Sequence, residues 1–191
     1  MASTTKHQQL QATDPLTALI TERGIEDWSE LIEYTRKLPY GRNQNREDFP
    51  LVLTEGKGTC SSKHSFLKNV ADLNGIDNVK LILGMYRMNQ VNTPKIGTTI
   101  SDGGLAFIPE AHCYLKLNNR RVDITTSDSN IENLTADILE EIEIEPEQVN
   151  TFKVEYHKNF LRKWLAENDI DMSFDTLWEL REQCIRNLEP K

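Results

Sequence analysis

Apolar residues recur at intervals of three and four in several stretches of the chain, which is the spacing of one face of an α-helix. The first stretch begins at Asp14-Pro15, where aspartate can cap a helix and proline fits its first position, and it stops at Gly24. Residues 131–141 are also interpreted as helical. The other predicted helices cover residues 28–37, the stretch from Cys60 to Gly75, and residues 154–167 and 174–188.

Three stretches have the character of β-strands. Residues 79–88 are mostly apolar, as in a buried strand, and residues 111–117 and 120–125 follow as a pair. Asn118-Asn119 separates this pair and predicts a tight hairpin turn. A turn centred there pairs Leu115 with Val122. The order of helices, then strands, then helices predicts an α+β domain.

The predicted hairpin register sorts its side chains by polarity, which supports the register. His112 and Asp123 fall on the polar face as diagonal neighbours, about 7–8 Å apart between backbones and within reach of long side chains. A loop of odd length would place these two residues on opposite faces. Cys113 falls on the apolar face and is interpreted as a buried core cysteine. The apolar face carries Cys113, Leu115, Leu117, Val122 and Ile124.

The domain organisation is predicted from composition along the 191 residues. Residues 1–13 are rich in Gln, Thr and Ser and indicate a flexible tail, and residues 14–191 form a single domain. Residues 89–110 form a long loop, which usually carries function or is mobile. The acidic run at 140–147 is interpreted as a solvated face. Trp164 and Trp178, on the apolar stripes of the last two helices, are expected to pack against the domain.

Charge and cysteine content narrow the function classes. The net charge of −8 disfavours general binding of nucleic acid, because the phosphate backbone would repel the protein. Three cysteines are too few for a disulfide framework and favour a reducing compartment. The beginning of the chain lacks the apolar stretch of a signal peptide, and the longest apolar run is too short to span a membrane. We therefore expect a cytoplasmic protein without a membrane partner; its oligomeric state is not predicted.

Cys60 occupies the predicted start of a helix, in the sequence Gly-Lys-Gly-Thr-Cys-Ser-Ser-Lys-His. The positive end of the helix dipole and the unpaired backbone N–H groups there favour a thiolate over a thiol. A histidine is suited to exchange a proton with this thiolate near neutral pH, and a carboxylate can fix its tautomer. Cys60, His112 and Asp123 therefore form a candidate site for acyl transfer.

Three elements resemble the transglutaminase-like superfamily, a branch of the papain-like thiol enzymes. They are Gly58-Thr59-Cys60 at a helix start, His112-Cys113-Tyr114 in one strand and Asp123-Ile124-Thr125 at the end of the next. Residues 32–40, with their Leu-Pro-Tyr, are similar to the helix and extended segment that precede the family's cysteine. The resemblance covers residues 28–126, and the helical part at 150–189 lies outside it.

The resemblance implies a papain-like core in which a catalytic cysteine at a helix N-terminus packs against an antiparallel sheet with flanking helices. It implies that Cys60 is the nucleophile, His112 its base and Asp123 the orienting carboxylate. The thiolate would attack an amide or peptide carbonyl of a protein, peptide or small molecule, and water or an amine would then take the acyl group. No cofactor or metal is expected. Further candidates for the oxyanion hole or substrate contacts are Asn43, Gln44, Asn45 and Tyr114.

Other interpretations of these residues stay open. His64 lies one helical turn after Cys60 and could be the base, although it lacks an obvious carboxylate to orient it. It could also join Cys60, His112 and Cys113 at a zinc ion, but adjacent strand residues point to opposite faces and the spacing is uncommon for zinc. His64 is interpreted as an exposed or packed helix residue, and His157 as a surface residue.

Two other functions fit the same family resemblance. A transglutaminase-like domain can serve as a binding module without catalysis, although such modules typically lose a member of the triad. An amine acyltransferase that uses coenzyme A could employ the same triad, but that family usually has Arg-Gly-Gly before its cysteine, where this chain has Gly-Lys-Gly-Thr. The resemblance therefore favours an enzyme that acts on amide carbonyls.

Overall fold

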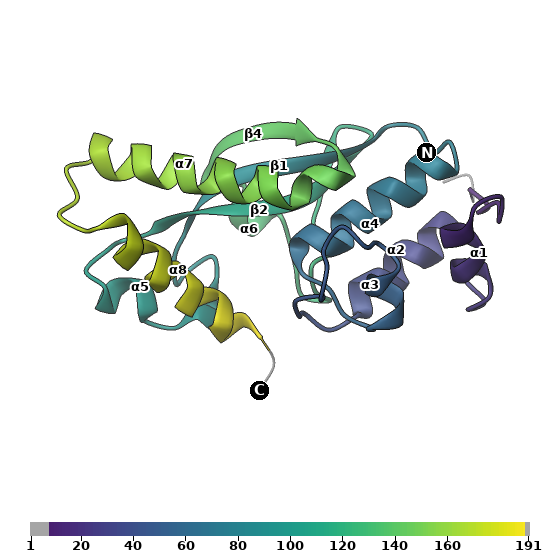
Figure 1. Cartoon of the computed structure of the whole chain (residues 1–191), viewed down its shortest axis with the longest axis horizontal. Coiled ribbons are helices and arrows are strands. Elements are labelled where there is room, and N and C mark those ends of the chain that lie inside the picture. The colour runs from purple at the N-terminus through teal and green to yellow at the C-terminus, as the bar shows by residue number, and fades with distance from the viewer. Residues whose placement is uncertain (1–7, 190–191) are drawn as a thin grey trace.

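A four-stranded antiparallel sheet forms the centre of the computed structural model, which describes residues 8–189. The order of the strands across the sheet is β3-β2-β1-β4. Helices flank the sheet, so the prediction of an α+β domain is confirmed (Figure 1). The strands are β1 (Val79–Met88), β2 (Ile108–Leu117), β3 (Arg120–Val122) and β4 (Ile138–Ile144).

The helices gather at two ends of the molecule. Helices α1 to α4 lie toward one end in Figure 1, and α5, α7 and α8 lie toward the other. No helix in the described part of the chain has both the length and the apolar character needed to cross a lipid bilayer. The helices are α1 (Pro15–Thr21), α2 (Trp28–Lys37), α3 (Leu51–Thr54), α4 (Cys60–Leu73), α5 (Thr99–Asp102), α6 (Glu132–Thr135), α7 (Thr151–Glu167) and α8 (Phe174–Leu188), with short 3₁₀ helices η1 (Pro94–Ile96) and η2 (Pro146–Val149).

The hairpin between β2 and β3 has the predicted register, with Leu115 opposite Val122. Asn118 and Asn119 at the turn have φ values of 49° and 63°. Asparagine tolerates this left-handed backbone better than most residues do, and two such residues in succession match the twist of a two-residue hairpin. The register therefore follows from the turn as well as from the alternation of apolar side chains.

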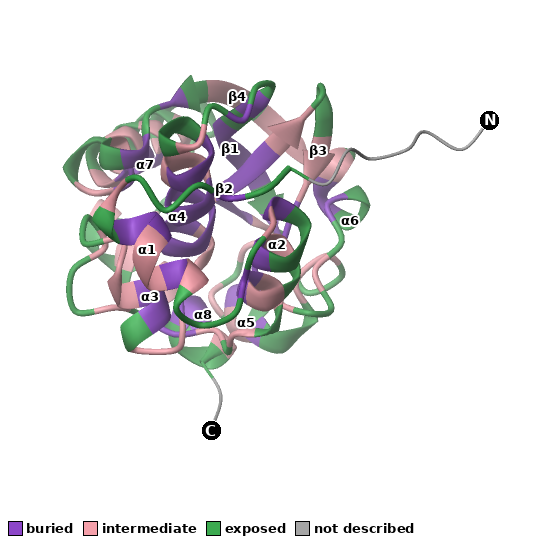
Figure 2. Ribbon diagram, turned by 90° about the vertical axis from the view of Figure 1, so that its right-hand side faces the viewer, coloured by how far each residue is buried: buried purple, intermediate pink, exposed green. Residues whose placement is uncertain are grey.

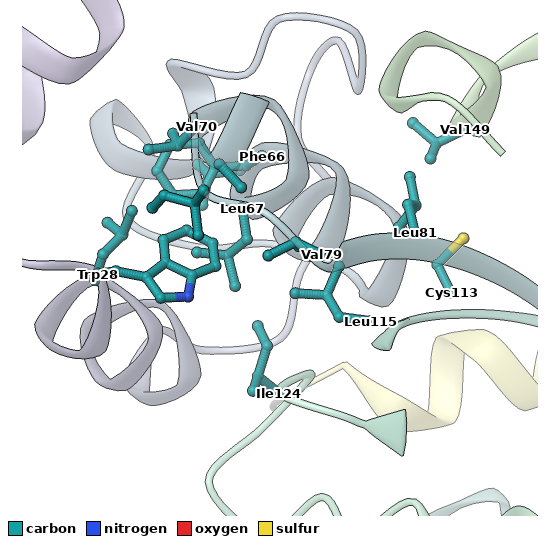
Figure 3. Close-up of a cluster of buried hydrophobic side chains, with 14 of the residues drawn as sticks. Trp28, Phe66, Leu67, Val70, Val79, Leu81, Cys113, Leu115, Ile124 and Val149 are labelled. Atoms are coloured by element: carbon teal, nitrogen blue, oxygen red, sulfur yellow. The ribbon is translucent and has the colours of Figure 1, made fainter. Parts of the chain in front are cut away.

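The first core lies between α4 and one face of the sheet. Leu81, Leu83 and Met85 alternate along β1 toward this core, where they join Phe66 of α4. Figure 3 shows this packing, with Trp28 of α2 beside the α4 side chains. Buried residues run along α4, β1 and β2 (Figure 2). Each large apolar side chain that is fully buried contributes about 1.5–3 kcal/mol to the free energy of unfolding.

The second core includes residues from the opposite face of β1 and from the two C-terminal helices. Ile82 of β1 contributes to it together with Leu161 of α7 and Leu177 of α8. Trp164 and Trp178 are partly buried and pack against the same cluster, as predicted. The sheet therefore joins helices from both halves of the sequence.

The prediction of one helix over residues 131–141 is wrong. Only a single turn, α6, forms there, and strand β4 begins at Ile138. The acidic run is also more than a solvated face, because its carboxylates bind cations on other strands of the sheet. Glu143 lies 2.7 Å from Lys80, and Glu141 lies 2.8 Å from Arg121. These cross-strand ion pairs favour a strand over a helix at this edge of the sheet.

Residues 8–13 are attached to the domain, although the sequence predicts a flexible tail over 1–13. Gln9 forms a β-bridge with Asp27, and Leu10 is buried with 8% exposure. The N–H of Gln11 donates to the side chain of Asn74 at 2.7 Å. The prediction for residues 1–7 lies outside the described residues. The loop predicted over 89–110 includes η1, α5 and the beginning of β2.

Candidate active site

Cys60 is the first residue of α4, and a capping box fixes this helix start. The N-cap residue Thr59 accepts a hydrogen bond from the N–H of Ser62 through its hydroxyl, and the Ser62 hydroxyl accepts from the N–H of Thr59 at 2.9 Å. The first N–H groups of a helix have no acceptor within the helix, so they create a positive potential around the sulfur. Cys60 is partly exposed, whereas Cys113 and Cys184 are buried.

Lys63 ties this helix start to two other segments. Its buried ammonium donates to the carbonyl of Leu38 at 2.5 Å and to the carbonyl of Thr125 at 2.7 Å. The side chain passes so close to Gly58 that a Cβ atom there would lie 2.7 Å from Lys63 Cγ. A glycine before the cysteine is therefore required for this packing. Through Lys63, the position of Cys60 is set relative to the segment that contains Asp123.

His112 and Asp123 contact each other as the hairpin register predicts. His112 lies on β2, Asp123 follows β3, and the imidazole Nε2 is 2.9 Å from Asp123 Oδ2. The other carboxylate oxygen accepts from the N–H of Thr125 at 2.9 Å and from its hydroxyl at 2.6 Å. Asp123 is only 7% exposed, and these bonds hold its carboxylate in one orientation. The structure thus brings together all three residues of the predicted triad.

The charges of the triad stabilise one another. Burial alone raises the pKa of Cys60, but attraction to Lys153 and His112 and a hydrogen bond with His112 outweigh it and bring this pKa to about 5. Burial lowers the pKa of His112, but Asp123 and Cys60 raise it well above its usual value. Burial opposes ionisation of Asp123, yet His112 holds the pKa of that carboxyl well below its usual range. A thiolate and an imidazolium are therefore favoured at neutral pH.

His64 has a structural role at the base of the site. Its Nε2 accepts a hydrogen bond from the N–H of Ile124 at 3.0 Å, so the proton of the neutral ring is on Nδ1, which donates to the carbonyl of Cys60 at 2.7 Å. Burial is the main cause that lowers the pKa of His64 to about 4. The expectation that no carboxylate lies near it is wrong, because Asp123 Oδ1 is 3.6 Å away. Both ring nitrogens are occupied, so His64 is not available as a base for Cys60.

Lys153 is a site residue that the sequence does not predict. It lies near the start of α7, is 6% exposed, and places its Nζ 3.8 Å from Cys60 Sγ. The same ammonium donates to the hydroxyl of Ser61 at 2.6 Å. Lys153 is 93 residues from Cys60, in a helix whose pattern indicates only packing, so no spacing in the sequence connects them. Within residues 8–189, no group of three His, Cys, Asp or Glu side chains is arranged to hold a metal ion.

A cavity of about 470 Å³ opens beside the triad. The segment after α2 contributes Tyr40 to its wall, and α8 contributes Trp178 and Arg181. Arg181 binds the buried carboxylate of Glu110 with two hydrogen bonds of 2.5 and 2.8 Å. The cavity combines apolar and charged walls, as binding sites for small molecules or peptide side chains do.

His157 also lines this cavity, so the prediction that it is a surface residue is wrong. It is 2% exposed, and its Nε2 contacts the carbonyl of Pro109 at 2.9 Å. Burial is the main cause that lowers its pKa to about 4. His157 is therefore a neutral packing residue between α7 and β2.

The other predicted oxyanion and substrate residues lie away from the cavity. The amide nitrogen of Asn43 donates to the carbonyl of Lys57 at 3.0 Å and to the carboxylate of Glu55 at 2.9 Å. Gln44 and Asn45 are exposed, and the hydroxyl of Tyr114 binds Glu141. Among the described residues that line the cavity, none of these four appears. Tyr40, Arg42 and Arg46 of this upstream segment line the cavity together with Cys60.

Comparison of this chain with protein-family models, with curated proteins and with solved structures found no match.

Proposed function

We propose that this chain is a thiol enzyme of the transglutaminase-like, papain-like type, which acts on amide or peptide carbonyls through a cysteinyl thioester. The observation that carries the proposal is the alignment of Cys60, His112 and Asp123 beside an accessible cavity. His112 lies beside the thiol at the helix start and lowers its pKa, and the His112 Nε2 lies 2.9 Å from Asp123 Oδ2. This arrangement, with His112 between the nucleophile Cys60 and the orienting carboxylate of Asp123, supports acyl transfer.

The proposed reaction begins with the thiolate of Cys60. Its sulfur attacks the carbonyl carbon, a C–S bond forms, and the negative charge moves to the carbonyl oxygen. The C–N bond then breaks, and the imidazolium of His112 gives its proton to the leaving amine. In the second half, neutral His112 accepts a proton from water or from an acceptor amine as it attacks the thioester, and breakage of the C–S bond restores the thiolate.

Donors for the oxyanion are available beside the sulfur. The backbone N–H of Cys60 is at the first position of α4, where no acceptor within the helix competes for it. Tyr40 lines the same cavity, and burial, followed by the nearby Cys60, raises the pKa of its hydroxyl. The phenol therefore stays protonated and can donate a hydrogen bond. We assign the oxyanion hole to these two groups in place of Asn43, Gln44 and Asn45.

The first prediction concerns the reactivity of Cys60 with iodoacetamide. The alkylation rate of Cys60 should stay nearly constant from pH 6 to pH 8, because a thiol with a pKa of about 5 is already ionised. A free thiol with a pKa near 8.5 should react roughly ten times faster per pH unit over the same range. Cys184, whose pKa is raised by burial to about 11, should react far more slowly. Mass spectrometry of tryptic peptides measures each rate.

Acylation of the enzyme tests the chemistry itself. p-Nitrophenyl acetate should give a burst of one equivalent of p-nitrophenol and an acetyl group on Cys60. The variant C60A should lose the burst, H112Q should slow it by roughly 10²–10⁴-fold, and the control C184A should keep it. Amide and glutamine peptides, with and without an added amine, then separate hydrolysis from transfer. A silent binding module would show an unreactive Cys60, and that result would overturn the proposal.

A further inference from the structure

Lys153 places a positively charged ammonium in a buried position. Its ammonium is buried at the junction of α7 with the start of α4, and burial of an unpaired ammonium costs several kcal/mol. Its hydrogen-bond partner, the Ser61 hydroxyl at 2.6 Å, is neutral. An anion close to Nζ offsets this cost.

Cys60 can supply this anion. Its sulfur lies 3.8 Å from Lys153 Nζ. Glu110 is a buried carboxylate that lines the same cavity, but it already accepts two hydrogen bonds from Arg181, of 2.5 and 2.8 Å. That ion pair satisfies both oxygens of Glu110. Lys153 and His112 are the cations whose attraction lowers the pKa of Cys60.

The remaining titratable groups around the sulfur are neutral. Tyr40 and Cys113 have pKa values that burial raises, and the buried His157 has a pKa of about 4. The buried anions of the triad are thus the thiolate of Cys60 and the carboxylate of Asp123, and His112 lies between them. The buried ammonium of Lys63 is on the Asp123 side, where it binds the carbonyl of Thr125, and Lys153 is the ammonium on the side of the sulfur.

We infer that Lys153 is a further catalytic residue, whose ammonium holds Cys60 as a thiolate and stays beside the negative charge as it moves from sulfur to the carbonyl oxygen. This inference rests on the proposed function of Cys60 as a nucleophile. Ser61 follows Cys60 in the chain, so its hydroxyl keeps the ammonium next to the reacting atoms through the reaction. Helix α7 is then part of the catalytic site and not only a packing element.

The test measures the pH midpoint of iodoacetamide labelling at Cys60 in the full chain. In wild type this midpoint should lie near 5. In K153M it should rise by at least one pH unit, which lowers the rate at pH 5 at least about fivefold, and K153R should stay within about half a unit of wild type. K163M is the control, since it removes an exposed lysine from the same helix and should leave the midpoint unchanged.

The outcomes separate this inference from the proposed function. If wild type has the low midpoint and folded K153M keeps it, Lys153 is only a packing residue and the inference fails while the nucleophile stands. If wild type itself titrates like a free thiol, both fail. Should K153M not fold, as judged by circular dichroism, K153Q repeats the comparison, because its amide can still donate a hydrogen bond but carries no charge. A midpoint for K153Q equal to that of wild type would likewise overturn the inference.

Discussion

At the scale of single residues, the neighbours of each histidine decide its charge. His112 lies beside two anions, Asp123 and Cys60, and they hold its proton. His64 and His157 are buried, with a carboxylate 3.6 and 3.8 Å away respectively, but burial outweighs this attraction and both have pKa values of about 4. The same side chain is therefore charged in one position and neutral in two others within one site. Sequence spacing does not distinguish these environments.

The neutral His157 predicts a dependence of stability on pH. Its pKa is about 4 when folded and 6.5 when unfolded, so the unfolded state binds more protons between these values. The free energy of unfolding should therefore fall as the pH drops from 6.5 toward 4, and His157 alone accounts for roughly 2 kcal/mol between pH 7 and pH 5. Urea unfolding at several pH values should show a smaller fall in H157Q than in wild type. Parallel curves for the two proteins would contradict this role.

The sequence predicts a site residue when the residues that position it are close to it in the chain. It does not predict a site residue that is positioned by contacts with distant segments. Cys60 was found because helix boundaries leave local signals, and His112 and Asp123 were placed together because hairpin parity is a local property. Lys153 reaches the site from another helix, and Tyr40 reaches it through the bridge between its backbone and Gly58. Such contacts depend on how elements pack, which residue types alone do not specify.

At the scale of elements, three features fix the start of α4. Gly58, the capping box of Thr59 and the buried Lys63 all act on one turn of backbone. A side chain at Gly58 would meet Lys63 Cγ at 2.7 Å and the Ser62 hydroxyl at 3.0 Å. The direction of α4, and therefore the position of the Cys60 sulfur, depends on the absence of a side chain at Gly58.

The variant G58A tests this dependence. Overpacking at the helix start should lower the free energy of unfolding by about 1–3 kcal/mol and should slow the labelling of Cys60. The control is G75N at the other end of α4, where φ is +61° and no atom lies near the new Cβ. Asparagine tolerates this conformation, so G75N should cost less than about 1 kcal/mol and leave labelling unchanged. Equal effects of the two variants would exclude the packing argument.

The elements also show where sequence patterns fail. Strand β4 alternates isoleucine with glutamate, which is a strand pattern, but residues 131–141 also fit a helix when they are read without their neighbours. Pairing with β1, and the ion pair between Glu143 and Lys80 of β1, decide in favour of the strand. The hairpin of β2 and β3 needed no such partner, because its turn residues and its alternation agree within one short segment.

At the scale of the whole molecule, α8 is joined to the sheet by a buried ion pair. Arg181 binds Glu110 through two hydrogen bonds, and burial of that carboxylate is offset by Arg181, which lowers the pKa of Glu110 to about 2. Because both side chains are largely buried, removal of one leaves an unpaired charge that water cannot solvate.

We expect R181M to lower the free energy of unfolding by about 3–5 kcal/mol. The double variant E110M/R181M removes both charges and should recover most of this loss. R186M is the control on the same helix, since its ion pair with Glu179 is exposed and should contribute less than about 1 kcal/mol. Urea unfolding measures all four proteins. A double variant no more stable than R181M would mean that the guanidinium acts through packing alone.

The wide separation of the site residues along the chain has a consequence for synthesis. Lys153 follows Cys60 by 93 residues, and at 5–20 residues per second a ribosome needs roughly 5–20 s to add them. During this interval the growing chain holds Cys60 without the cation from α7 and without the wall that α8 builds. Under the proposed function, we therefore expect Cys60 of a nascent chain to be a poor nucleophile until translation has passed both helices.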